Sequence, residues 1–204
     1  MNLRLPTGKI ARVIKVLPFG LLSATKLLSQ VFYRTEHDWV QDPGPTPWND
    51  VRIIVLLNHT SLFEPLFTST MPWSFVRRFA RHGVFPAAKE TLDRPLAGPL
   101  LRAMAPNVLP LTRRRDESWS EFVEQLTGHS MLIFIPEGRM KRRNGLDKHG
   151  LPMTIKGGIA DVLLRLDTGG MIIAYSGGLH HVQAPGDRFP RLFRTIRVRL
   201  ERLT

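Results

Sequence analysis

The sequence predicts an α/β domain with a mostly parallel sheet flanked by helices, preceded by an N-terminal amphipathic helical segment. Short continuous apolar runs, typical of buried strands, occur at residues 53–57, 108–111, 131–135 and 171–175. Helix-compatible stretches lie between or beside them, at residues 61–69, 96–104, 116–126 and 155–166. Strands that alternate with helices indicate parallel pairing, since each crossover returns the chain to the same end of the sheet. Residues 196–200 alternate apolar side chains with arginine, which predicts an edge strand.

The composition places the chain among globular proteins with one domain. Of the 204 residues, 43% are hydrophobic and 23% charged, so there is enough apolar material for a core, and disorder or a fibrous repeat is excluded. The chain has no cysteine. This excludes a disulfide framework, a thiolate metal site and a cysteine nucleophile, and it fits a reducing compartment.

Residues 1–41 are expected to form amphipathic helices that associate with a membrane. Apolar residues recur at helical spacing, and Pro18 and Gly20 are expected to divide the segment into two short helices. Their cations would meet anionic lipid, although the same pattern also fits helices packed on the protein's own core. No apolar run is long enough to span a bilayer. Residues 42–50, with three prolines and a glycine, are expected to link this segment to a main domain over residues 51–204.

The charge is strongly positive and unevenly spread. Lys and Arg total 29 against 17 Asp and Glu, a formal net charge of +12. Such a surface attracts nucleic acid, anionic lipid or phosphorylated substrates. Anionic lipid or phosphate ranks first and nucleic acid is not expected, because basic residues are not interleaved with aromatic ones in a recognisable nucleic-acid fold. Any one cluster can also be an ordinary solvated surface. The clusters lie in residues 1–35, 113–115, 139–143 and 188–202.

The strand at 53–57 is followed by a pair of residues that can perform acid–base chemistry. His59 and Glu64 would lie on different faces of a regular helix, but they can meet if His59 sits in the turn before the helix. The carboxylate would then orient the imidazole, whose other nitrogen takes a proton from a substrate hydroxyl. The alternative is that His59 caps the helix and Glu64 is a first-turn acid. The adjacent His180 and His181 have no neighbouring metal-ligand pattern and are expected to be loop residues.

Three motifs in order resemble those of the phospholipid/glycerol acyltransferase family. Residues 58–65 (NHTSLFEP) resemble its first motif, His, four residues, Asp. Residues 108–113 (VLPLTR) resemble the second, and residues 134–139 (FIPEGR) resemble the third, Phe-Pro-Glu-Gly-Thr-Arg-Ser. Residues 156–158 (KGG) match the Lys-Gly-Gly that commonly follows. The resemblance runs over about residues 51–175.

The resemblance implies the glycerolipid acyltransferase fold and an O-acyltransferase similar to 1-acylglycerol-3-phosphate acyltransferases. His59 would be the general base and Glu64 its partner. The substrate-binding residues implied are Arg113, which would hold the acceptor phosphate, with Glu137, Gly138, Arg139, Lys141 and Lys89. Each also has an ordinary structural interpretation: Arg113 in a solvated loop, Glu137 and Gly138 in a plain turn, Lys89 at the start of a helix. Glu64 in place of Asp, and Met140 and Lys141 in place of the family's Arg and Ser, indicate a diverged subgroup with an atypical acceptor.

The same resemblance implies the partners. The acyl donor would be acyl-CoA or an acyl carrier protein, the acceptor a lyso-lipid, and no metal or other cofactor would be needed. The protein would act at the cytoplasmic face of a membrane, as a peripheral or monotopic protein on an anionic surface. The alternative is a non-catalytic lipid-binding or scaffold protein that retains the fold.

Overall fold

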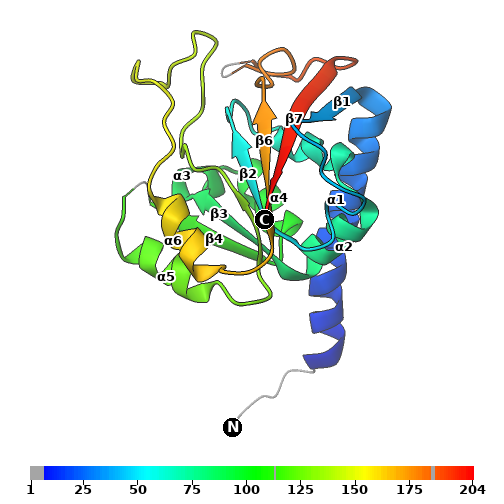
Figure 1. The fold of residues 1–204 in the computed structure, drawn as a ribbon. Coiled ribbons are helices and arrows are strands. Elements are labelled where there is room, and N and C mark those ends of the chain that lie inside the picture. The colour runs from blue at the N-terminus through cyan, green and yellow to red at the C-terminus, as the bar shows by residue number, and fades with distance from the viewer. Residues whose placement is uncertain (1–6, 113, 185–186) are drawn as a thin grey trace.

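A computed structural model describes residues 7–112, 114–184 and 187–204 (Figure 1). Its elements in chain order are α1 (Thr7–Phe32), β1 (Arg34–Trp39), β2 (Val51–Leu57), the 3₁₀ helix η1 (Glu64–Thr70), α2 (Trp73–His82), β3 (Gly83–Ala88), α3 (Lys89–Leu92), α4 (Ala97–Met104), β4 (Asn107–Leu111), α5 (Glu117–Gln125), β5 (Met131–Phe134), α6 (Gly158–Arg165), β6 (Gly170–Ser176) and β7 (Thr195–Leu203).

The strands form one mixed sheet in the order β1-β7-β6-β2-β5-β3-β4. Every neighbouring pair is parallel except β6 and β7, which run antiparallel. The predicted α/β class with a mostly parallel sheet is therefore confirmed. Because β2 lies at the centre and runs parallel to β5 and β6, its carboxyl end opens beside theirs, where ligands bind in sheets of this kind.

Helices cover both faces of the sheet, and side chains of β2 alternate between them. Ile54 and Leu56 point into a core shared with α1, η1, α2 and α4. Ile53 and Val55 point into a second core shared with α5 and α6. Figure 1 shows the two helix groups on opposite sides of the strands. A strand buried on both faces reads as a continuous apolar run, which is why β2 was visible in the sequence.

The N-terminal segment differs from the expectation in two respects. It contains one helix, α1, with Pro18 inside it, rather than two short helices. A proline costs a helix one backbone hydrogen bond, but the turns after Pro18 pack on the protein body through buried Leu22, Lys26 and Ser29, and this packing stabilises the helix. Residues 34–39 form the edge strand β1, parallel to β7, rather than helix. No helix in the described part of the chain has the length and apolar character to cross a bilayer.

Other elements depart from the prediction for local reasons. The stretch at 61–69 forms the 3₁₀ helix η1 from Glu64 onward. The strand expected at an edge is β7, which is interior because β1 covers it. Strand β3 was not predicted because Gly83 and Pro86 argue against a strand; Pro86 is tolerated because β5 pairs only with Gly83 and Val84. Helix α2 lies outside the predicted helices.

Candidate active site

The turn after β2 presents His59 at the carboxyl end of the sheet. Asn58 ends the strand in the left-handed conformation, with φ of 60°. Asparagine tolerates this conformation better than most residues because its short polar side chain can bond locally. The chain then runs through His59, Thr60 and Ser61 to η1, which begins at Glu64. The histidine therefore lies before the helix, as the acid–base hypothesis requires.

His59 and Glu64 lie in contact. The Nδ1 of His59 is 3.1 Å from Oε1 of Glu64, and the two side chains are 14% and 8% exposed. Oε1 also accepts the backbone N–H groups of Thr60 (2.9 Å) and Ser61 (3.0 Å), so the carboxylate is fixed by the turn itself. The contact does not meet hydrogen-bond geometry: Nδ1 of His59 and Oε2 of Glu64 are both buried without a hydrogen-bond partner in the described residues. Catalytic hydrogen bonds are often poorly aligned before substrate binds.

Glu137 lies beneath the turn, and its contacts there differ from the expected substrate contact. Its side chain is buried and accepts the backbone N–H of Asn58 at Oε1 (3.2 Å) and that of His59 at Oε2 (3.1 Å). It does not line the cavity described below. The carboxylate from the end of β5 thus fixes the backbone that carries His59, which is a positioning contact.

Lys141 and the loop after β6 hold the same turn. The backbone N–H of Lys141 donates to the carbonyl of His59 (2.6 Å), and the Nζ of Lys141 donates to Oδ1 of Asn58 (2.8 Å). After β6, the N–H of Leu179 donates to Oγ1 of the fully buried Thr60 (2.6 Å). The turn is therefore held by the segment that follows β5, through Glu137 and Lys141, and by the loop after β6, through Leu179. No sequence motif indicated the contact from Leu179.

The paired histidines after β6 serve these loops. The Nε2 of His180 bonds the carbonyl of Lys141 (2.7 Å), and the Nε2 of His181 bonds the carbonyl of Thr195 (2.8 Å). The two rings therefore bond different segments, in keeping with the expected loop role. Within the described residues, no group of three potential metal ligands gathers.

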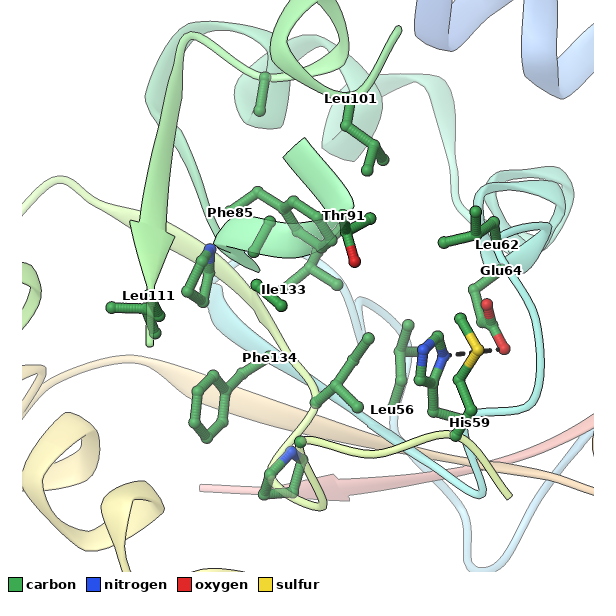
Figure 2. Close-up of a pocket in the computed structure, with 18 of the residues that line it drawn as sticks. Leu56, His59, Leu62, Glu64, Phe85, Thr91, Leu101, Leu111, Ile133 and Phe134 are labelled. Carbon is green, nitrogen blue, oxygen red and sulfur yellow. Dashed lines mark ion pairs between the residues drawn. The ribbon is translucent and has the colours of Figure 1, made fainter. Parts of the chain in front are cut away.

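A cavity of about 480 Å³ opens beside His59. Its walls are mainly apolar and come from β2, β3, β4, β5, η1, α4 and the inner side of α1, as Figure 2 shows for the residues labelled there. His59 and Glu64 lie at one side, next to Leu56 and Leu62. The apolar lining includes Leu22, Phe67, Phe79, Phe85, Leu101, Met104, Ile133 and Phe134. The volume is typical of a site for a small molecule or part of a lipid.

Cationic side chains border the same cavity. They are Arg94, Arg114, Arg115, Arg139 and Lys156. Two of them are already paired with carboxylates of the protein, Arg115 with Asp161 and Arg139 with Asp147. Arg94, Arg114 and Lys156 are exposed. The cavity therefore joins an apolar interior to a positively charged border, next to a histidine.

The expected substrate-binding residues are only partly brought together. Gly138 and Arg139 line the cavity, whereas Lys141 and Lys89 do not; Lys89 is exposed at the start of α3. Arg113 lies outside the described residues, so its role stays a prediction. Lys156, which the sequence placed in the Lys-Gly-Gly motif, does line the cavity.

Arg139 organises the loop that follows it. Its guanidinium bonds Asp147, whose side chain is fully buried. Asp147 also accepts the backbone N–H groups of Leu151 (2.9 Å) and His149 (2.8 Å). The pKa of Asp147 lies below its ordinary value because the carboxylate accepts the N–H of Leu151 and, with a smaller effect, that of His149. The charged side chain of Arg139 lowers this pKa further. Because its charge is matched by Asp147, Arg139 contributes less net attraction for a substrate anion than the motif implied.

Gly138 turns the chain between β5 and this loop. Its φ of +61° is left-handed, which glycine adopts at little cost. A Cβ at this position would lie 3.5 Å from the Nζ of Lys156, an ordinary contact. The requirement for glycine therefore comes from backbone conformation, and the turn places Lys156 close to the backbone at the cavity border.

A buried lysine connects α1 to the site. The Nζ of Lys26 donates to the carbonyls of Thr68 (3.3 Å), Ser69 (2.9 Å) and Met71 (2.8 Å) at the end of η1. The side chain is 4% exposed, and burial lowers its pKa from the ordinary value. Ser29 adds a hydrogen bond to the carbonyl of Leu66 (2.9 Å). These bonds fix η1, which carries Glu64. Sequence periodicity gave no sign of them.

Comparison with known proteins defines the protein family to which the chain belongs. Residues 37–176 match the Acyltransferase family, and the chain belongs to this family. None of the curated proteins compared with the chain matches it.

One solved structure that is similar to the chain is the 1-acyl-sn-glycerophosphate (LPA) acyltransferase PlsC from Thermotoga maritima. The alignment has a TM-score of 0.58 and 17% identity, and it covers 97% of this chain and 72% of that chain. This similarity confirms that the α/β architecture is the acyltransferase fold.

Proposed function

We propose that the protein transfers a fatty acyl group from a thioester donor to a hydroxyl of a lysophospholipid or related lyso-lipid. The observation that carries this proposal is the contact between His59 and Glu64 at the wall of an apolar cavity with a cationic border. An apolar cavity accommodates an acyl chain, and the cations attract an anionic head group or donor. Membership of the Acyltransferase family supports the same reaction class.

In the proposed mechanism, His59 acts as general base. With Nδ1 facing Glu64, the neutral ring carries its proton on Nδ1 and has Nε2 free for the acceptor. As Nε2 takes the hydroxyl proton, the acceptor oxygen forms a bond to the thioester carbonyl carbon. The tetrahedral intermediate collapses, the carbon–sulfur bond breaks, and the leaving thiolate takes the proton back from the imidazolium. The Glu64 carboxylate stabilises that imidazolium. Base catalysis of this kind contributes about 10²–10⁴ in rate.

The cations at the cavity border have a proposed role in binding. Arg94, Arg114 and Lys156 are exposed, so they are placed to bind the phosphate of the acceptor or of the donor. A phosphorylated donor such as acyl-CoA and an acidic acyl carrier protein both suit this charge. Arg113, next to Arg114, keeps its expected role as an acceptor-phosphate residue. No metal or other cofactor enters these steps.

We also propose that α1 attaches the protein to an anionic membrane surface. Among residues 16–31 of α1, the exposed side chains are uncharged, and apart from Gln30 they are apolar or small: Val16, Leu17, Gly20, Ala24, Leu27, Leu28 and Val31. We call this set the outer face of α1. The polar Lys26 and Ser29 are turned inward, the reverse of the usual arrangement on a water-exposed helix. Such a face suits the headgroup region of a bilayer, and the proposed location is peripheral or monotopic, at the cytoplasmic face.

The test of the proposed reaction is direct. Purified full-length protein is incubated with acyl-CoA or acyl-carrier-protein donors against a panel of lyso-lipids in vesicles, and products are read by mass spectrometry. The proposal predicts a diacyl product and a stoichiometric free thiol. Retained lipid binding without transfer from any donor would instead favour a non-catalytic lipid-binding protein.

A further inference from the structure

The loop between β6 and β7 carries an unusual run, Arg188-Phe189-Pro190-Arg191-Leu192-Phe193-Arg194, which we call the RF loop. Phe189 and Phe193 are 71% and 75% exposed, and Leu192 is exposed as well. The three arginines of the run are also exposed. Two phenylalanines this exposed, interspersed with three like charges, mark a surface that contacts something other than water.

The arginines of the RF loop differ from those that follow in β7. The β7 arginines make ion pairs with acids of the protein: Arg197 with Glu36 and Arg199 with Asp38 on the edge strand β1, and Arg202 with Asp50 before β2. Within the described residues, the RF loop has one such pair, between Arg191 and Asp187 at 3.7 Å. The loop therefore carries positive charge that the protein does not neutralise, and this charge is complementary to an anionic surface.

The loop is fixed against the end of α1. Phe193 has φ of 58°, a left-handed conformation that is unfavourable for a bulky residue. Its N–H donates to the carbonyl of Phe32 (2.8 Å), and the two rings lie 6.1 Å apart. Figure 1 shows the start of β7 beside the carboxyl end of α1. The exposed ring of Phe193 thus lies against the end of the helix whose outer face is apolar.

We propose that the RF loop is a second membrane-contacting element, in which Phe189 and Phe193 enter the interface of an anionic bilayer and the arginines bind lipid phosphates. The inference rests on the membrane attachment proposed for α1 and adds a separate site to it. Guanidinium groups bind phosphate through paired hydrogen bonds, and each basic side chain near an anionic bilayer raises affinity about five-fold.

The absence of cysteine from the chain allows a clean test. Phe189→Cys introduces one site for an environment-sensitive fluorophore in full-length protein. The matched control is Leu164→Cys, on α6 across the sheet, where the leucine is 81% exposed. On vesicles of phosphatidylcholine and phosphatidylglycerol, the probe at 189 is expected to shift to the blue and to be quenched by lipids that carry a quencher on the acyl chain. The probe at 164 is expected to remain in water. Equal responses at the two positions would overturn the proposal.

Vesicle affinity gives an independent readout. Arg188→Gln and Arg165→Gln each remove one exposed positive charge, and the first is expected to weaken binding about five-fold while the second leaves it unchanged. If the protein binds vesicles but both variants have the wild-type affinity, the proposed role of the RF loop is refuted and attachment by α1 stands. If wild-type protein does not bind, both proposals fail. If the probe at 189 becomes shielded without lipid as protein concentration rises, the surface is an interface between two copies and the RF-loop proposal is overturned.

Discussion

The contact between His59 and Glu64 makes a quantitative prediction for Glu64→Gln. At the 3.1 Å separation of Nδ1 and Oε1, an effective dielectric of about 20 gives an attraction of about 5 kcal/mol between carboxylate and imidazolium. When substrate binding aligns the ring, a glutamine oxygen can accept one hydrogen bond from it, worth about 1 kcal/mol, but the charge is lost. We therefore expect a cost of about 3–4 kcal/mol in the transition state, which is a fall in kcat of about 10²–10³.

The assay measures kcat and KM separately, with saturating donor and a lyso-lipid acceptor in mixed micelles. Because the amide oxygen can still accept the N–H groups of Thr60 and Ser61, the urea midpoint should stay near the wild-type value. KM should change little. Glu64→Ala serves as the control that loses both the charge and the turn contacts, and it should also lower the free energy of unfolding. Wild-type turnover in Glu64→Gln would refute the proposed role of the carboxylate.

Three further predictions concern the groups that support the site. Glu137→Gln should lower kcat while the cavity still binds lipid, because the amide nitrogen cannot accept one of the two N–H groups of Asn58 and His59. A changed KM for the lyso-lipid with unchanged kcat would instead indicate that Glu137 contacts substrate. Lys26→Met should lower the free energy of unfolding in urea by about 3 kcal/mol, since three carbonyls at the end of η1 lose their donor, and a loss near zero would contradict the proposed connection of α1 to η1. Asp147 has a lowered pKa, so its stabilising contribution is present above the ordinary value of 3.8 and is lost as pH falls through the lower folded value. Asp147→Asn should therefore be less stable than wild type at neutral pH and show a shallower loss of unfolding free energy in acid, and parallel pH profiles would contradict this.

The central strands and the histidine turn were predictable because their determinants are local. An apolar run buried on both faces identifies β2, and the residues that follow it identify the turn. The N-cap of α5 was equally local: Asp116 accepts the N–H of Ser118, as expected of an acidic residue before a helix. The determinants of helix α2 are also local, since buried Phe75, Val76 and Phe79 recur at helical spacing, although α2 is not among the predicted helices.

The remaining features depend on contacts distant in sequence. Glu137 bonds a turn almost eighty residues earlier, and nothing in the Pro-Glu-Gly motif distinguishes such a contact from substrate binding. Lys26 is a cation within an apolar pattern, which argues for exposure, yet carbonyls at the end of η1 draw it inward. The charge of Arg139 is matched by Asp147, which lies in a loop of no recognisable pattern. Three-dimensional arrangement decides these cases, and residue type alone does not.

The most direct test of the account compares His59→Ala with His82→Ala in acyl transfer. His82 is exposed at the end of α2, away from the cavity, so its loss controls for removal of an imidazole. With an active donor–acceptor pair, His59→Ala is predicted to lower kcat by about 10²–10⁴ while His82→Ala remains at wild-type level. Full turnover in folded His59→Ala would contradict the claim that this imidazole removes the proton of the acceptor.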